Sequence, residues 1–223
     1  MHQRKGKKIL IYFFLLFLVG SINNIELNNI DFYKIKNINV RGLEDNNNLI
    51  LLNEIKKLDL RNIFFINENN ISNQINLNNL VEKFKAFKRY PSTLDIHIEK
   101  TKFLAKANYQ GKIFLIGSNG KLLSNNFSNN ELPFIFGRLD VLEFLNLKEK
   151  IDRSRFSYNE IRNLYYFSSK RWDFELKNNV LIKLPKDDTE ESLDLAFEFL
   201  NNNNFKNIKI IDARVKNQII IND

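Results

Sequence analysis

An uninterrupted apolar run, Ile9–Val19, directly follows a short tail with four cationic side chains. These cations are Arg4, Lys5, Lys7 and Lys8. A basic tail followed by an apolar run is typical of an export element, in which the tail stays in the cytoplasm and the rest of the chain crosses the membrane. The run therefore assigns residues 28–223 to an exported compartment.

The length of the run leaves its fate open. About 11 residues form roughly 17 Å of helix, whereas the hydrocarbon core of a bilayer is about 30 Å thick. Residues 20–22 can extend the run, but Asn23 and Asn24 then bring polar groups close to the far interface. Val19 and Ser21 also suit a signal-peptide cleavage site. A retained anchor and a cleaved signal both remain, and the residues favour the anchor.

The composition is that of a globular chain without thiol chemistry. The 223 residues are 43% hydrophobic and 13% aromatic, which is enough for one large or two small domains. The sequence has no cysteine, which excludes a disulfide framework and a thiolate metal site. The net charge of +8 would suggest a nucleic-acid partner in a cytoplasmic protein. In an exported chain it fits anionic headgroups or wall polymers, and a bias toward Lys and Asn explains it without any partner.

The first part of the exported chain predicts strand, helix, helix and strand. The expected elements are a strand at Ile35–Val40, helices at Asn46–Leu58 and Leu77–Lys88, and a strand at Thr93–Glu99. The second helix rests on the helical spacing of Leu80, Phe84 and Phe87. Apolar and polar residues alternate in the last strand, so Asp95 and His97 are expected on a solvent-facing side.

The second part predicts mostly hairpins. The expected strands are Phe103–Tyr109, Lys112–Ile116, Lys121–Leu123, Arg171–Lys177, Val180–Leu184, Ile208–Arg214 and Gln218–Ile221. The expected helices are Leu139–Leu147, a helix opened by the capping box of Ser157 and Glu160 and running through Tyr165, and Thr189–Leu200. Hairpins without a βαβ rhythm indicate an α+β fold with an antiparallel sheet.

Residues with catalytic or metal-binding chemistry are sparse. His97 is the one exported histidine. A single histidine cannot form a two-histidine metal site, and no acidic partner for a serine triad is evident beside it. The carboxylates of residues 187–191 cluster at a helix start, where they favour the helix dipole. No glycine-rich phosphate loop is present. We expect no catalytic activity, no cofactor, no metal, no small-molecule substrate and no nucleic acid.

Asp212 and Arg214 introduce the last strand of the chain. One interpretation is an ordinary salt bridge at a strand end. The other is functional, because a last strand tends to lie at a sheet edge, where free N–H and C=O groups are available to a partner strand.

Several stretches taken together resemble one family. They are IKNINVRGLE (Ile35–Glu44), YPSTLDIHIE (Tyr90–Glu99), GKIFLIGSNGKLL (Gly111–Leu123), RWDFELKNNVLIKL (Arg171–Leu184) and IDAR (Ile211–Arg214). In this order behind a basic tail and one export helix, they resemble the FtsQ/DivIB family of bacterial cell-division proteins. The first two stretches also suit any POTRA module, whereas their combination with the later motifs is specific.

The resemblance implies an α+β protein with a single N-terminal transmembrane helix, a POTRA domain (β-α-α-β-β) and a mainly antiparallel β domain with flanking helices. The implied boundaries are a cytoplasmic basic tail at 1–8, a transmembrane helix at 9–25, a linker at 26–32, the POTRA domain at 33–100 and the β domain at 101–223. The implied function is a non-catalytic scaffold of the divisome in the cell inner membrane at the division septum, with its C-terminus in the periplasm. The implied partners are FtsB and FtsL at the β domain and other divisome proteins at the POTRA domain.

The resemblance also implies a binding site, at which a segment of FtsB adds a strand beside the last strand. The residues carried over are Arg171, Arg214, Val215, Lys216, Asn217, Gln218, Ile219, Ile220 and Ile221, while Trp172 is expected in the core. The chain departs from the family pattern in three places. Val215 replaces an aromatic residue, Asn217-Gln218 replaces a pair of small residues, and residues 99–102 lack the proline of an E-x-x-P motif. Backbone pairing survives such changes, but the side-chain pockets must differ.

Two other classes of protein are alternatives to this resemblance. A POTRA-containing transport or outer-membrane assembly factor would need repeated POTRA units or a barrel segment, and the sequence shows neither. A secreted periplasmic protein, released by signal cleavage, is disfavoured as an enzyme by the missing catalytic residues.

Overall fold

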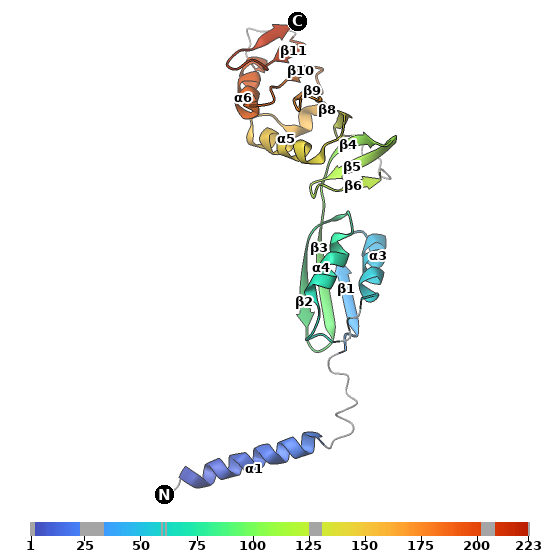
Figure 1. The fold of residues 1–223 in the computed structure, drawn as a ribbon, viewed down its shortest axis with the longest axis vertical. Helices are drawn as coiled ribbons and strands as arrows, with labels where there is room; N and C mark the ends of the chain where they lie inside the picture. The colour runs from blue at the N-terminus through green and yellow to red at the C-terminus, as the bar shows by residue number, and fades with distance from the viewer. Residues whose placement is uncertain are drawn as a thin grey trace. The chain divides into compact units, whose positions relative to one another are not determined.

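The computed structural model describes residues 3–22, 34–58, 60, 62–124, 131–201 and 208–222. The chain forms two compact units. The first unit comprises residues 1–74 and 85–97, and the second comprises 75–84 and 98–223. Figure 1 shows the elements of each unit.

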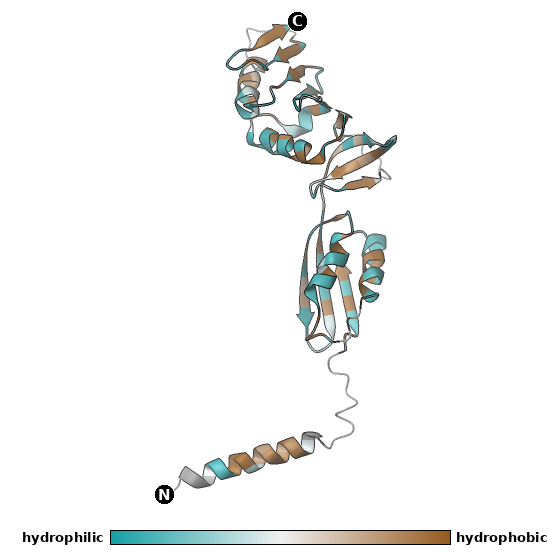
Figure 2. Ribbon diagram, in the orientation of Figure 1, coloured by the Kyte–Doolittle hydropathy of each residue, from teal (hydrophilic) through white to brown (hydrophobic). Residues whose placement is uncertain are grey.

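The N-terminal helix α1 spans Gln3–Ile22. Its side chains from Ile9 to Val19 are exposed, and Figure 2 shows this stretch as a continuous apolar segment. Within the described residues, no helix is long and apolar enough to cross a membrane. The predicted linker at 26–32, and residues 23–25 of the predicted transmembrane helix, lie outside the described residues.

A three-stranded sheet follows, with two helices on one side of it (Figure 1). Its strands are β1 (Asn37–Arg41), β2 (Val81–Arg89) and β3 (Thr93–Lys100), in the order β1-β3-β2, and its helices are α3 (Asp45–Lys56) and α4 (Glu68–Asn76). β1 runs parallel to β3. The element order along the chain is the β-α-α-β-β of the expected POTRA domain.

The helix predicted at 77–88 is wrong. Residues 81–89 form the edge strand β2, and the second helix is the earlier α4. Leu80, Phe84 and Phe87 have helical spacing by coincidence, and pairing beside β3 overrides that local signal. In α4 the buried Ile71 and Ile75 lie one helical turn apart. The surrounding asparagines obscured this pattern, because they have low helix propensity.

The second unit is built on a nine-stranded sheet. Its strands are β4 (Phe103–Tyr109), β5 (Lys112–Gly117), β6 (Leu122–Ser124), β7 (Phe134–Gly137), β8 (Ile161–Tyr166), β9 (Trp172–Leu176), β10 (Leu181–Lys183), β11 (Ile210–Asp212) and β12 (Ile220–Asn222). The strand order is β12-β11-β10-β9-β8-β7-β4-β5-β6. β7 pairs parallel with both β4 and β8, and β10 pairs parallel with β11, while the other neighbours are antiparallel. The sheet is therefore mainly antiparallel, as expected.

The helix predicted from the capping box at residues 157 and 160 is also wrong. Tyr158–Glu160 forms only a short 3-10 helix, η1, and residues 161–166 continue as β8. The Ser157 side chain makes no cap hydrogen bond. Ile161 and Leu164 are both buried, and the sheet on either side of β8 determines its conformation more strongly than the capping motif does.

The strand register places one residue per strand in a row along the core side of the sheet. The row is Ala107, Ile135, Leu164, Phe174, Ile182, Ile211 and Ile221. Two helices, α5 (Val141–Arg153) and α6 (Thr189–Leu200), contribute Phe144, Leu147 and Leu193 to the same buried cluster. Trp172 is buried in this cluster, as expected. Full burial of each large apolar side chain of this cluster contributes about 1.5–3 kcal/mol to stability.

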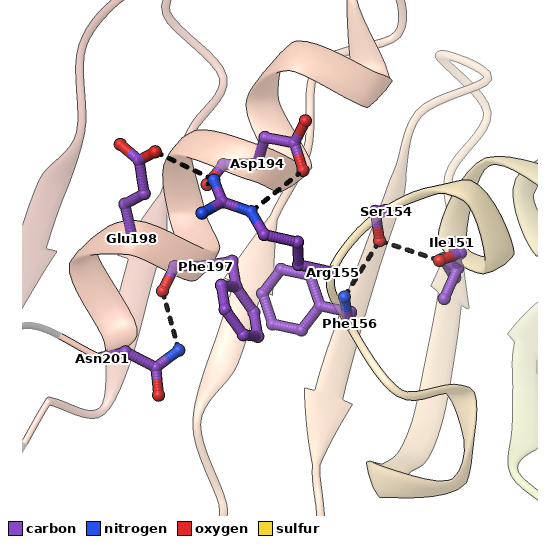
Figure 3. Close-up of polar contacts among 8 residues, drawn as sticks. All are labelled: Ile151, Ser154, Arg155, Phe156, Asp194, Phe197, Glu198 and Asn201. Atoms are coloured by element: carbon purple, nitrogen blue, oxygen red, sulfur yellow. Dashed lines mark hydrogen bonds and ion pairs between the residues drawn. The ribbon is translucent and has the colours of Figure 1, made fainter.

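Arg155, just after α5, ties the two covering helices together (Figure 3). Its Nη2 donates to Glu198 Oε1 at 2.9 Å, and its Nε lies 3.6 Å from Asp194 Oδ1. The guanidinium also lies over the Phe197 ring, 5.3 Å from its centroid. The next residue, Phe156, packs edge-on against Phe197. These contacts hold α6 in place over the sheet end that carries the last strands.

Candidate partner-binding edge

The last strand of the chain lies at one edge of the nine-stranded sheet. β12 pairs antiparallel with β11, with Ile211 opposite Ile221. On its other side, no strand of the described chain pairs with it. Its outward backbone N–H and C=O groups are therefore open to a further strand.

A compact turn connects β11 to the edge strand. Asn217 has a φ of 58°, and Gln218 N donates to the Val215 carbonyl at 3.1 Å. Asparagine tolerates this left-handed conformation better than most residues. Lys216 Nζ lies 3.0 Å from Asp188 Oδ2, so the turn is also attached to the start of α6.

The outer side of the sheet carries a charged row that ends at this edge. Asp173 on β9 is opposite Lys183 on β10. Lys183 is in turn opposite Asp212, and Asp212 is opposite Ile220. Asp173 is only 3% exposed, whereas Ile220 is 57% exposed. The row thus runs from a buried carboxylate to an exposed apolar side chain.

Two arginines flank the charged row. Arg214 binds Asp212, with its Nε 2.8 Å from Oδ1. Arg171 Nε lies 3.6 Å from Asp173 Oδ1, and its guanidinium stacks 4.1 Å from the centroid of the Phe167 ring. The Arg171 side chain is therefore oriented by an ion pair on one side and an aromatic face on the other.

The electrostatics of the two carboxylates differ. The hydrogen bond from Arg214 holds the pKa of Asp212 below its ordinary value, and Lys183 lowers it further. Burial raises the pKa of Asp173, against the attraction of Arg171, Lys183 and Arg214. Asp212 is thus satisfied by its neighbour, whereas Asp173 is ionised only at a desolvation cost.

The structure distributes the predicted site residues over four local environments. Val215, Lys216 and Asn217 form the turn rather than the start of a strand, and Gln218 closes that turn. Ile219 packs against the core cluster. Ile220 and Ile221 lie in β12, which extends one residue further, to Asn222. Arg171 and Arg214 belong to the charged surface beside the edge.

Sequence reasoning missed Asp173 and Lys183. Alternation within β9 placed Asp173 on the other face of the strand from Trp172 and Phe174, which indicated an exposed carboxylate. Its position two residues after Arg171, on the same face of the strand, was the available signal, since a nearby cation makes burial of a carboxylate less costly. The surface beside the edge strand can bind a partner through backbone hydrogen bonds and through charged side chains. Across the described ranges, no group of His, Asp and Glu side chains could hold a metal ion.

Comparison with known proteins assigns the fold to a family. The model for the C-terminal part of cell division protein FtsQ/DivIB matches residues 105–214, and the model for the FtsQ-type POTRA domain matches residues 33–100. The chain belongs to the FtsQ/DivIB family. The C-terminal match ends at Arg214, so the turn and the edge strand lie just beyond the matched residues.

Individual relatives agree with this assignment. The cell division protein FtsQ of Rickettsia bellii is 25% identical over 193 residues, covering 85% of this chain and 72% of the relative. FtsQ of Rickettsia typhi is 23% identical over the same coverage, and DivIB of Clostridium botulinum is 26% identical over 121 residues, or 54% of this chain and 46% of the relative. The match to the solved major extracytoplasmic domain of Geobacillus stearothermophilus DivIB covers 43% of this chain and 87% of that domain, at 11% identity and a TM-score of 0.33.

Proposed function

We propose that this FtsQ/DivIB chain is a non-catalytic scaffold of the division machinery that binds FtsB, together with FtsL, by strand addition at β12. The supporting observation is the place of β12 at the end of the strand order, with one side open. A segment that adds to this edge gains main-chain hydrogen bonds, and neighbouring side chains then select it. Arg171 and Arg214 supply charge beside the edge, and Val215 and Ile220 supply exposed apolar contacts.

Membrane attachment is the second part of the proposal. Residues 9–25 would anchor the chain in the inner membrane at the septum, with residues 1–8 in the cytoplasm and the POTRA and β domains, divided near residue 100, in the periplasm. The basic tail before an exposed apolar helix supports this orientation. The POTRA domain would then meet other divisome proteins.

Ile220→Pro tests strand addition. Proline removes a backbone donor and cannot continue the ladder, so we expect binding of FtsB to the whole chain, measured by calorimetry, to be abolished while the POTRA domain stays folded. Ile220→Val is the matched control, because it keeps the donor and the β-branched side chain. An unchanged affinity of the proline variant for FtsB would contradict strand addition at β12.

The anchor is tested by fractionation of cells that produce the whole chain. We expect the protein in the membrane fraction, resistant to alkaline extraction, with a mass that includes Met1. A mature protein that begins near Ile22 and stays soluble would contradict the anchor and leave strand addition unaffected.

A further inference from the structure

One end of the first unit gathers segments that are far apart in the sequence. Backbone N–H groups of Lys36 and Asn37 donate to the Ser92 carbonyl at 2.9 and 3.2 Å, so the chain enters β1 beside the turn between β2 and β3. Phe64, in the connection between α3 and α4, stacks on Tyr90 of that turn with ring centroids 5.0 Å apart. The entry of the chain, the α3–α4 connection and the β2–β3 turn therefore share one end of this unit, called here the entry end (Figure 1).

The entry end exposes large aromatic side chains. Phe64 is 52% exposed, Phe65 85% and Tyr90 59%. Isolated exposed apolar residues are ordinary, but three aromatic rings on two adjoining turns form a patch. Tyr and Trp are enriched at the interface between headgroups and acyl chains, and Phe is common on the apolar face of helices that lie in this interface.

The same end carries a lysine-rimmed cavity. It has a volume of about 250 Å³ and is lined by Lys34, Ile35, Lys36, Ile38, Lys56, Leu58 and Leu60. Apolar walls with ammonium groups at the rim suit an amphipathic, anionic ligand, since lysine stems cover apolar surface while their heads stay in water. Two further ion pairs of this unit join Glu54 to Lys57 at 2.6 Å and Glu68 to Lys88 at 3.4 Å.

The chain length ties this end to α1. α1 ends at Ile22, and Lys34 begins the described part of the first unit. The intervening segment, at about 3.5 Å per residue, reaches at most roughly 40 Å in any conformation. An anchored α1 therefore keeps the aromatic patch and the lysines within reach of the membrane surface.

We propose that the entry end docks on a lipid surface rich in anionic headgroups. The lysines Lys34, Lys36 and Lys56 bind headgroup phosphates, and Phe64, Phe65 and Tyr90 lie at the level of the interface. This inference rests on the proposed membrane attachment of residues 9–25. A basic cluster next to an anchored helix gains attraction from anionic lipid, which weakens as salt rises.

The test uses the whole chain with one environment-sensitive fluorophore, because the sequence has no cysteine to remove. Phe65→Cys carries the label, and Leu142→Cys, an apolar residue of α5 that is 78% exposed, is the matched control. The labelled chains are reconstituted into vesicles of phosphatidylcholine alone or mixed with phosphatidylglycerol, with a quencher on the headgroups. We expect quenching at position 65 in the mixed vesicles and little at position 142.

A charge-reversed chain completes the test. Lys34→Glu, Lys36→Glu and Lys56→Glu together, in the Phe65→Cys background, should lose the extra quenching that phosphatidylglycerol gives. The same number of reversals at Lys112, Lys170 and Lys177, which are exposed in the second unit, should not. Equal quenching at positions 65 and 142 in chains that float with the vesicles would overturn the docking and leave the anchor intact. Shielding of position 65 only on addition of FtsB and FtsL would also overturn it, in favour of a protein occupant. Chains that float with neither vesicle would overturn the anchor and the docking together.

Discussion

Arg214 binds both carboxylate oxygens of Asp212, with its Nε 2.8 Å from Oδ1 and 3.0 Å from Oδ2. Asp212 is the last residue of β11, and Arg214 leads into the turn before β12. The pair therefore orients the chain at the point where it leaves the sheet to form the edge. An ordinary surface salt bridge would contribute little, but this one positions the strand on which partner binding is proposed to depend.

The Asp212–Arg214 pair predicts a pH dependence. Because the pKa of Asp212 is lowered in the folded chain from 3.8, its stabilising contribution is fully present above that value and is lost as pH falls through the lower folded pKa. We expect wild type to exceed Asp212→Asn in free energy of unfolding near neutral pH, with the difference shrinking below pH 3.8. Urea titrations across acid pH check this. A difference between wild type and Asp212→Asn that does not change with pH would contradict the mechanism.

Asp95 was expected on a solvent-facing side, but it is buried in the first unit, and its carboxylate supports the second prediction. Asp95 is 1% exposed, accepts a hydrogen bond from Asn39 Nδ2 at 2.8 Å, and lies 2.6 Å from Arg89 Nε. The Asn39 bond and the two nearby arginines lower its pKa against burial. Asp95→Ala should lower the melting temperature, because Asn39 and Arg89 lose their acceptor. Calorimetry measures this, and Glu99→Ala, at an exposed carboxylate on the same strand, should leave the melting temperature unchanged.

The third prediction concerns the start of β2, which belongs to the second unit. Glu82 Oε2 accepts hydrogen bonds from Thr101 Oγ1 at 3.0 Å and Ser118 Oγ at 2.7 Å. Asn119 Nδ2 donates to the Val81 carbonyl at 2.8 Å. Removal of the shared acceptor by Glu82→Ala should destabilise the second unit by about 1–3 kcal/mol.

Hydrogen exchange locates this effect. Backbone amides at residues 117–122 should lose protection in Glu82→Ala and keep it in Lys83→Ala, at an exposed neighbour on the same strand. By the same argument, the amides of residues 117–122 should be better protected in a chain that begins at residue 75 than in one that begins at residue 101. Equal protection in both chains would show that these bonds add nothing to the second unit.

The sequence predicted elements best where one local signal dominates. The α6 helix was expected with the bounds it has, Thr189–Leu200, because an acidic start and one apolar stripe agree. The hairpin of β9 and β10 followed from strict alternation and an asparagine turn. Helices were predicted at 77–88 and from 157 through 165, where the structure has β2 and β8, because the apolar residues there also fit a helical period. Only sheet neighbours distant in sequence decide between helix and strand.

The candidate site was predicted in outline. The edge position of the last strand follows from its place at the chain end, and the Asp212–Arg214 pair follows from a spacing of two residues. The burial of Asp173 and its place opposite Lys183 were not predictable, because they depend on the register of β9 against β10. Likewise, β7 was missed because its four residues are too few to show a period.

The fourth prediction concerns Gly137, at the end of β7. Its φ is 103°, and a Cβ built there would lie 2.1 Å from the Tyr166 carbonyl oxygen. Tyr166 is its partner on β8, so the clash falls on the strand pair that joins β4 to the rest of the sheet. Gly111 offers a matched control, since its φ is also positive, at 78°, with no atom within 4 Å of the built Cβ.

The two glycines separate backbone strain from steric exclusion. Gly111→Ala should cost about 1–2 kcal/mol, the usual cost of a left-handed residue with a side chain. Gly137→Ala should cost clearly more, because β7 and β8 must also move apart to admit the methyl group. Urea unfolding of the whole chain measures both. Similar losses in the two variants would mean that β7 and β8 separate easily, and the close pairing of Gly137 with Tyr166 would then have no part in holding the sheet together.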